Sequence, residues 1–325
     1  MKAIPHMDTD RFLQWTATPP EPFQHHYLAM YSSVYGAIVT DPRLMLVPVD
    51  DHLVHRGDGV FETFKCVEGG LYNMRAHLDR LRQSARGIAL EVPWGRAELE
   101  QIVIETARLG GEKNCLVRVL VSRGPGSLGV NPYDCPKPAL YVIISQFKRP
   151  FMEEHPGGAR VISSAIPVKP RPFANIKSTN YLFNVLMKKE SVDAGVDFVI
   201  AFDEDGHMAE GPTENAGIVT RAGVLQFPRP DRILTGTTML RVLALAEKLV
   251  RSGTLTAAEQ TDIVRDAVGD AAEMLIVGTT PDVTSVVEFD GKPVGAGQPG
   301  PIAEALGNLL HEDILRNAIL RTRVF

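Results

Sequence analysis

A single lysine, Lys177, lies between a proline-rich stretch and a segment with helical patterning in "PFANIKSTNYLFNVLMKKE", residues 172–190. The pattern predicts a helix that begins just after Lys177, with Ser178 or Thr179 as its N-cap. The start of a helix carries partial positive charge, so an ammonium group there loses its proton more easily. A neutral lysine amine is a nucleophile, which favours Lys177 as a catalytic residue over an ordinary surface lysine. The apolar residues expected to form a packed stripe on this helix are Tyr181, Leu182, Val185 and Leu186.

A carboxylate follows in "MAEGPTENAGIV", residues 208–219, where Glu210 stands just before a Gly-Pro pair. A buried carboxylate at this position could pair with a heteroaromatic nitrogen. The alternative is a hairpin turn that carries charged residues.

Two Gly-Thr-Thr triplets occur further along, in "LTGTTMLR" (residues 234–241) and "VGTTPD" (residues 277–282). The first runs into a predicted helix, whose free N–H groups and Thr hydroxyls would form an anion site. Two such sites beside an activated lysine indicate a phosphorylated cofactor that is bound covalently. Pyridoxal 5′-phosphate (PLP) requires this set: a Schiff-base lysine, a charge partner for the pyridine nitrogen and a phosphate site.

A glycine pattern, "GPGSLG" at residues 124–129, matches the dinucleotide fingerprint GxGxxG and follows a predicted strand. That fingerprint requires a helix to begin at the glycines. Here "VNPYDCPKP" follows, which cannot form a helix, so we interpret the segment as a loop.

The elements that must position these residues are strands and helices in irregular alternation, which predicts an α+β fold. We expect a small N-terminal α+β domain over residues 1–147, beginning with an irregular arm over 1–30. A charged Pro/Gly linker over 148–158 and a large cofactor-binding domain over 159–325 follow. Predicted helices cover residues 75–90, 96–110, 178–195 and 237–253, and another begins near Pro301. Predicted strands cover residues 59–67, 71–74, 115–123, 139–147, 159–166, 197–203, 216–220, 224–228, 273–279 and 283–291.

Bulk properties narrow the class of protein. The chain has 325 residues and a net charge of −5 with both signs interspersed, which gives no basic stripe for nucleic acid and no polybasic segment for a membrane surface. Three cysteines without CxxC spacing argue against a disulfide framework or a zinc site and favour a reducing compartment. The sequence contains no run of 18 apolar residues, so we predict no transmembrane helix. We therefore expect a cytoplasmic protein that acts on small molecules.

Taken together, the motifs resemble those of the fold-type-IV PLP enzymes: branched-chain aminotransferases, D-amino acid aminotransferases and aminodeoxychorismate lyases. The resemblance extends from about residue 32 to the C-terminus. It rests on "HRGDGVFETF", "RAHLDRL", "NIKSTNYLFNVL", "AEGPTENAGIV", "LTGTTMLR" and "VGTTPD", in the family's order and spacing. It implies a two-domain fold with the cofactor between the domains, and a homodimer.

The resemblance also implies residue roles. Lys177 would form the internal aldimine and carry the proton between the substrate and the cofactor, and Glu210 would pair with the pyridinium nitrogen. Arg75 resembles the phosphate-binding arginine, and Tyr181 resembles the tyrosine near the cofactor hydroxyl. The remaining cofactor-binding residues implied by the resemblance are Leu234, Gly236, Thr237, Thr238 and Thr279.

The substrate-binding residues depart from each family pattern. D-amino acid aminotransferases carry an Arg-x-His pair in the loop after the "LVSRG" strand, whereas this chain has "GPGSLGVNP". The ending "GVNP" resembles bacterial branched-chain enzymes, but Leu116 and Arg56 replace two of their tyrosines. Candidates for the substrate site are Phe61, Arg56, Arg118, Arg123 and Thr280, with the arginines as carboxylate ligands or, alternatively, as structural ion pairs.

The resemblance implies an aminotransferase for a branched-chain or D-amino acid and a 2-keto acid. The alternative is an aminodeoxychorismate lyase, which would release pyruvate and 4-aminobenzoate. A third reading, a PLP-binding scaffold without activity, is disfavoured because the lysine, the glutamate and the phosphate motifs are all intact.

Overall fold

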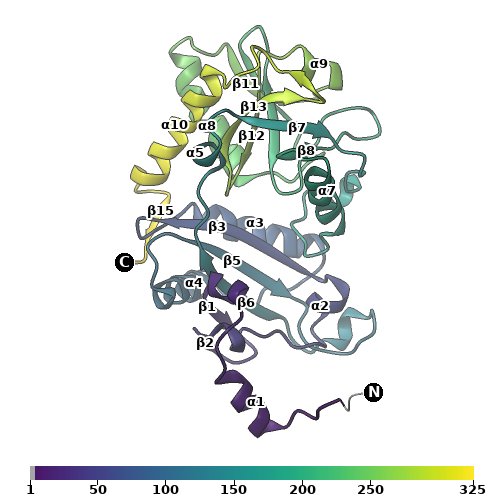
Figure 1. Ribbon diagram of the computed structural model, residues 1–325, viewed down its shortest axis with the longest axis vertical. Helices are drawn as coiled ribbons and strands as arrows, with labels where there is room; N and C mark the ends of the chain where they lie inside the picture. The colour runs from purple at the N-terminus through teal and green to yellow at the C-terminus, as the bar shows by residue number, and fades with distance from the viewer. Residues whose placement is uncertain (1–3) are drawn as a thin grey trace.

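The computed structural model describes residues 4–325 and contains two β-sheets, each covered by helices (Figure 1). In this part of the chain the first sheet has seven strands in the order β15-β4-β3-β5-β6-β1-β2, all antiparallel. Its strands are β1 (Tyr27–Ser32), β2 (Ala37–Val39), β3 (Gly59–Val67), β4 (Gly70–Tyr72), β5 (Cys115–Ser122), β6 (Ala139–Gln146) and β15 (Arg321–Arg323).

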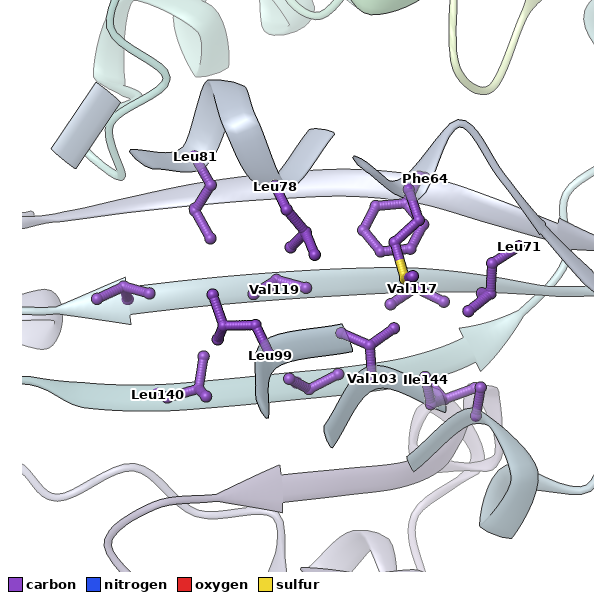
Figure 2. Packing of buried hydrophobic residues seen from close by; sticks show 14 of the residues in the cluster. Phe64, Leu71, Leu78, Leu81, Leu99, Val103, Val117, Val119, Leu140 and Ile144 are labelled. Carbon is purple, nitrogen blue, oxygen red and sulfur yellow. The ribbon is translucent and has the colours of Figure 1, made fainter. Parts of the chain in front are cut away.

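Helices α3 (Met74–Gly87) and α4 (Arg96–Gly110) pack on one face of the first sheet. Figure 2 shows Leu78 and Leu81 of α3 and Leu99 of α4 directed at the sheet. Successive strand residues point to opposite faces, so β5 sends Val117 and Val119 into this core and Arg118 to the other face. The helix-covered face is therefore the core, and the opposite face of β3 and β5 is free to line a site.

The second sheet is mixed and has eight strands among the described residues, seven of them in the order β11-β10-β9-β12-β13-β7-β8. Helices α8 (Thr237–Arg251) and α10 (Pro301–Arg316) pack against it, through a core that includes Met239, Leu245 and Leu306. The strands are β7 (Ala159–Ser163), β8 (Phe198–Ile200), β9 (Asn215–Val219), β10 (Val224–Pro228), β11 (Ala257–Thr261), β12 (Glu273–Gly278) and β13 (Asp282–Phe289), and the eighth, β14 (Lys292–Pro293), pairs with β13.

This mixture of helices and largely antiparallel sheets confirms the predicted α+β class. Shorter helices complete the described chain: α1 (Thr9–Thr16), α2 (His52–Arg56), α5 (Phe151–Glu154), α6 (Arg171–Ala174), α7 (Leu182–Asp193), α9 (Arg265–Gly269) and the 3₁₀ turns Pro22–His26, Pro42–Leu44 and Pro132–Asp134. No helix among residues 4–325 has the length and apolarity needed to cross a bilayer.

The division into domains 1–147 and 159–325 stays a prediction, and two features bear on it. After α10 the chain returns to the first sheet, where β15 pairs with β4 (Figure 1). The expected linker, residues 148–158, contains α5, which packs on β13. The last residues therefore belong to the first sheet, and the linker is not wholly irregular.

The N-terminal arm is more regular than expected. The Asp8 carboxylate accepts the N–H of Arg11 and so caps α1, and β1 already begins at Tyr27. The first residues of the expected arm, 1–3, lie outside the described chain.

Of the four residues expected to form an apolar stripe, only Tyr181 is packed within this chain, against Phe61. Leu182, Val185 and Leu186 are 64%, 58% and 40% exposed, and the buried residues of α7 are instead Asn184, Met187 and Ser191. The apolar periodicity of the sequence identified this face of α7, but it could not show whether another part of the chain packs against the face.

Candidate active site

A cavity of about 330 Å³ lies between the two sheets. Phe61, Thr63 and Arg118 line it from β3 and β5, and the segments around β9, α8 and β12 line it from the other side. The predicted site residues that the structure brings together here are Lys177, Glu210, Tyr181, Leu234, Gly236, Thr237, Thr238, Thr279, Phe61, Arg118 and Thr280. Three predicted arginines, Arg56, Arg75 and Arg123, do not line it.

Lys177 is held by its backbone in an extended segment between α6 and α7. Its N–H donates to Ser84 Oγ (3.1 Å), and its carbonyl accepts the N–H of Phe61 (3.0 Å). Helix α7 begins only at Leu182, with Tyr181 as the N-cap residue. The expectation that Lys177 lies at a helix start, capped by Ser178 or Thr179, is therefore wrong, and Thr179 Oγ1 instead donates to the carbonyls of Gly57 and Gly59.

The Lys177 ammonium is nonetheless easy to deprotonate, for a different reason. Its side chain is buried, and Nζ lies 4.8 Å from the ring centre of Phe61 and 5.9 Å from that of Tyr181. Burial and then the positive charge of Arg80 lower the pKa of Lys177 from 10.5 to about 8. Desolvation, rather than a helix dipole, makes this amine a nucleophile near neutral pH.

Glu210 lies in the same cavity. Its Oε2 accepts the N–H of Leu234 at 2.9 Å. Burial raises the pKa of Glu210 to about 7, opposed by the Leu234 hydrogen bond and by the charges of Lys169 and Lys177. A cationic ring nitrogen placed beside it would favour the ionised form.

Donors suited to a phosphate surround the start of α8. Gly236 is the N-cap residue, Thr237 and Thr238 form the first turn, and Thr279 follows β12. A Cβ added at Gly236 would overlap Asn215 Oδ1, so this position accommodates no side chain. Free helix N–H groups and hydroxyls on one wall, with a lysine and a carboxylate on the others, fit PLP.

Arg75, the expected phosphate ligand, does not reach the cavity. Its side chain is 69% exposed and lies beside Glu100 (3.6 Å) on the outer surface of α3. Arg80, five residues later on the same helix, lines the cavity instead. It donates to Thr235 O (3.0 Å), so it joins α3 to the segment that leads into α8.

Sequence reasoning missed a polar face of α3 formed by His77, Arg80 and Ser84. His77 contacts Thr237 Oγ1 through Nε2 (3.0 Å) and Glu62 Oε2 through Nδ1 (2.7 Å). Burial alone would raise the pKa of Glu62. The charge and hydrogen bonds of Arg80, together with the hydrogen bond to His77, outweigh burial and lower this pKa to about 2. The three residues have helical i, i+3, i+7 spacing, which could have revealed the face.

The other two arginines have structural roles. Arg123 donates to both carboxylate oxygens of Asp58 at 3.0 Å, and Arg56 donates to the carbonyls of Leu128 and Gly129. Arg56 therefore holds the loop over residues 124–129, and Arg123 holds Asp58 and the carbonyls of Ile88 and Ala89. The segment 124–129 contains no helix, as expected from the rejection of the dinucleotide motif. Of the three substrate-site arginines, Arg118 alone lines the cavity.

A buried lysine, a half-buried carboxylate and donors suited to a phosphate line one cavity, and this set of residues fits PLP. The family model for amino-transferase class IV matches residues 59–289, and the chain belongs to this family. It is 41% identical over 289 residues to the chloroplastic D-amino-acid transaminase of Arabidopsis thaliana, covering 89% of this chain and 77% of that protein. It is 33% identical over 263 residues to a putative branched-chain-amino-acid aminotransferase of Methanocaldococcus jannaschii, covering 80% and 88%.

Solved structures show the same fold. A T.th. branched-chain amino acid aminotransferase complexed with N-(5′-phosphopyridoxyl)-L-glutamate aligns with a TM-score of 0.84 at 28% identity. The alignment covers 92% of this chain and 99% of that one. The same enzyme with pyridoxamine 5′-phosphate also aligns with a TM-score of 0.84. The protein is accordingly a PLP-dependent aminotransferase.

Proposed function

We propose that this aminotransferase transfers the amino group of a branched-chain or D-amino acid to a 2-keto acid, with PLP in the cavity between the two sheets. The observation that carries the proposal is that Lys177 and Glu210 line one cavity with the Gly236–Thr238 anion site. When bound, PLP supplies a ring that stabilises negative charge at the substrate α-carbon.

The residues of the chain would divide the work. Lys177 holds the cofactor covalently and, once displaced by substrate, moves a proton at the α-carbon as a neutral amine. Glu210 pairs with the ring nitrogen. Burial, followed by the charge of Glu210, raises the pKa of Tyr181, so its phenol stays protonated and can donate a hydrogen bond. Arg80, in place of Arg75, supports the phosphate wall formed by Leu234, Gly236, Thr237, Thr238 and Thr279.

Substrate would bind on the wall that belongs to the first sheet. Arg118 extends from β5 on the face opposite the core, and its guanidinium carbon lies 5.8 Å from the ring centre of Phe61. It is the arginine available in the cavity to bind a substrate carboxylate. Phe61 would contact the substrate side chain, and Thr280 would donate from the far wall.

The test is the absorption spectrum of the purified holoenzyme, recorded while single amino acids are added without any keto acid. L-leucine, L-glutamate, D-alanine and D-glutamate separate the branched-chain and D-amino acid alternatives. Conversion of the Lys177-bound cofactor to its amine form by one of them identifies the substrate and its hand. Release of pyruvate from aminodeoxychorismate, with no conversion by any of the four, would contradict the proposal.

We also propose that the protein is a homodimer. The apolar face of α7 formed by Leu182, Val185 and Leu186 is exposed in the single chain, and Phe183 of the same helix is exposed as well. A second copy of the chain would remove this surface from water. The proposal agrees with the family resemblance of the sequence.

A cytoplasmic location is proposed as well. Cys66 and Cys115 are buried and opposite each other on β3 and β5 but are free thiols. Cysteines without a disulfide are typical of a reducing compartment.

A further inference from the structure

A second, smaller cavity of about 20 Å³ lies next to the first at Glu210, and neither Phe61 nor Arg118 lines it. Glu210 and Gly211 line both cavities, and Lys169 and Asn184 line the smaller one. A volume of about 10–15 Å³ is enough for one water molecule, provided that it finds polar partners.

Four polar side chains line this cavity: Lys169, Asn184, Glu210 and Arg232. Lys169 is half-buried, and its Nζ lies 4.8 Å from the ring centre of Tyr181, which fixes the side chain against the site. Asn184 is 8% exposed, and its Nδ2 donates to Pro212 O at 2.6 Å. Its Oδ1 is buried and has no hydrogen-bond partner among residues 4–325. A buried acceptor of this kind costs free energy unless a donor reaches it.

The charges around the cavity leave Lys169 as the counter-ion for Glu210. Arg232, the other cation in the lining, is already paired with Asp203 and with Asp262. From the large cavity Glu210 faces Lys177 and Arg80, but Arg80 is bound to Glu62. In the proposed function Lys177 acts as a neutral amine and so does not provide a permanent positive charge. Lys169 is the remaining cation at this cavity, and it forms no salt bridge with another carboxylate among residues 4–325.

We propose that Lys169 is a positioning residue for Glu210, acting through one water held in the small cavity by Asn184 Oδ1. The water accepts a hydrogen bond from Lys169 Nζ and donates one each to the Glu210 carboxylate and to Asn184 Oδ1, which satisfies all three groups. The link keeps Glu210 ionised and oriented toward the cofactor ring nitrogen. The inference rests on the proposed pairing of Glu210 with that nitrogen.

The test compares holoenzymes of Lys169→Met, Lys169→Arg and Lys189→Met with the unaltered protein. Lys189 is an exposed lysine of α7 and serves as the control. Two quantities are measured: the dissociation constant of PLP and the pH midpoint of the visible band of the Lys177-bound cofactor. Lys169→Met should weaken PLP binding on the order of tenfold and move the midpoint to higher pH, because a nearby positive charge is lost. Lys169→Arg should keep the dissociation constant of PLP within about threefold of the unaltered value and leave the pH midpoint near its original position. Lys189→Met should change neither quantity.

The outcomes separate this inference from the proposed function. If the unaltered protein forms no Lys177-bound cofactor, the proposed function fails and the inference fails with it. If it does, but Lys169→Met leaves both quantities unchanged or Lys169→Arg rescues neither, the inference alone is overturned. A crystal structure of the holoenzyme is a second measurement that does not depend on a variant. A water within hydrogen-bond distance of Lys169, Glu210 and Asn184 supports the proposal, and a dry cavity overturns it.

Discussion

The Glu62 carboxylate and the Arg80 guanidinium form two parallel hydrogen bonds of 2.6 and 2.7 Å, with the glutamate fully buried. This geometry joins β3 to α3 directly beneath the cavity. Because Arg80 also donates to Thr235 O, the pair connects the first sheet with the start of α8.

We expect Arg80→Met to lower the free energy of unfolding by about 3–5 kcal/mol, since it leaves a buried carboxylate without its partner. Chemical denaturation of the apo-protein measures the loss. Arg75→Met is the matched control on the same helix, and its exposed arginine should contribute less than about 0.5 kcal/mol. Addition of Glu62→Gln to Arg80→Met should recover part of the stability. Equal losses for Arg75→Met and Arg80→Met would contradict this assignment.

The attachment of PLP to the apo-protein should depend on pH through Lys177. The pKa of Lys177 is about 8, so the neutral amine increases about tenfold per pH unit below 8 and saturates above it. Stopped-flow absorbance between about pH 6 and pH 10 spans this range and measures the rate of attachment. An Nα-acetylated free lysine, with its side-chain pKa at about 10.4, is the reference and should accelerate throughout the range. A protein rate that rises in parallel with this reference would show that the amine is not perturbed.

Gly236→Ala should weaken PLP binding by on the order of tenfold or more. The added Cβ would displace Asn215, whose Nδ2 donates to Leu234 O (3.0 Å) at the edge of the anion site. Overpacking of this kind also costs about 1–3 kcal/mol of stability. Gly269→Ala is the control because a Cβ there meets open space. Fluorescence titration with PLP gives the affinities, and equal affinities for the two variants would argue against a close-fitting anion site.

Arg118→Gln should lower kcat/KM by about 10–100-fold for every substrate that carries a carboxylate, because a charge-assisted pair is lost. Steady-state kinetics measures kcat/KM, with the amino acid that converts the bound cofactor in the absorption experiment as the substrate. Arg56→Gln, at the end of α2 and outside the cavity, should leave kcat/KM within about twofold. If Arg56→Gln produced the larger effect, substrate would bind elsewhere.

Val185→Glu should shift the protein from dimer to monomer, because it places a charge on the exposed apolar face of α7. Sedimentation equilibrium measures the mass of each form. Lys189→Ala alters the charged side of the same helix and should leave the dimer intact. A monomeric unaltered protein at micromolar concentration would contradict the dimer proposal.

Local patterns predicted many of the elements that build the site. The amphipathic helices α3 and α4, the hairpin β3–β4 and the strands β5 and β6 all follow from apolar periodicity and turn residues. Lys177, Glu210 and the two Gly-Thr-Thr segments reach one cavity as expected. Each of these motifs carries its own local chemistry.

The errors concern relations between elements, which local patterns do not contain. Arg75 and Arg80 are five residues apart on one helix, which separates their side chains by about 140° around its axis. Which of them faces the cavity depends on how α3 sits on β3. In the same way, the apolar periodicity of α7 could not distinguish a face packed within the chain from one that remains exposed.

Strand β15 has a consequence for how the protein is made. Arg321, Thr322 and Arg323 pair with Tyr72, Leu71 and Gly70, and Phe325 packs against Gly69. On the ribosome, β4 emerges long before β15, so this edge of the first sheet stays open until every strand of the second sheet has been synthesised. The first sheet is thus complete only after residues 321–323 have been synthesised, long after the strand they pair with.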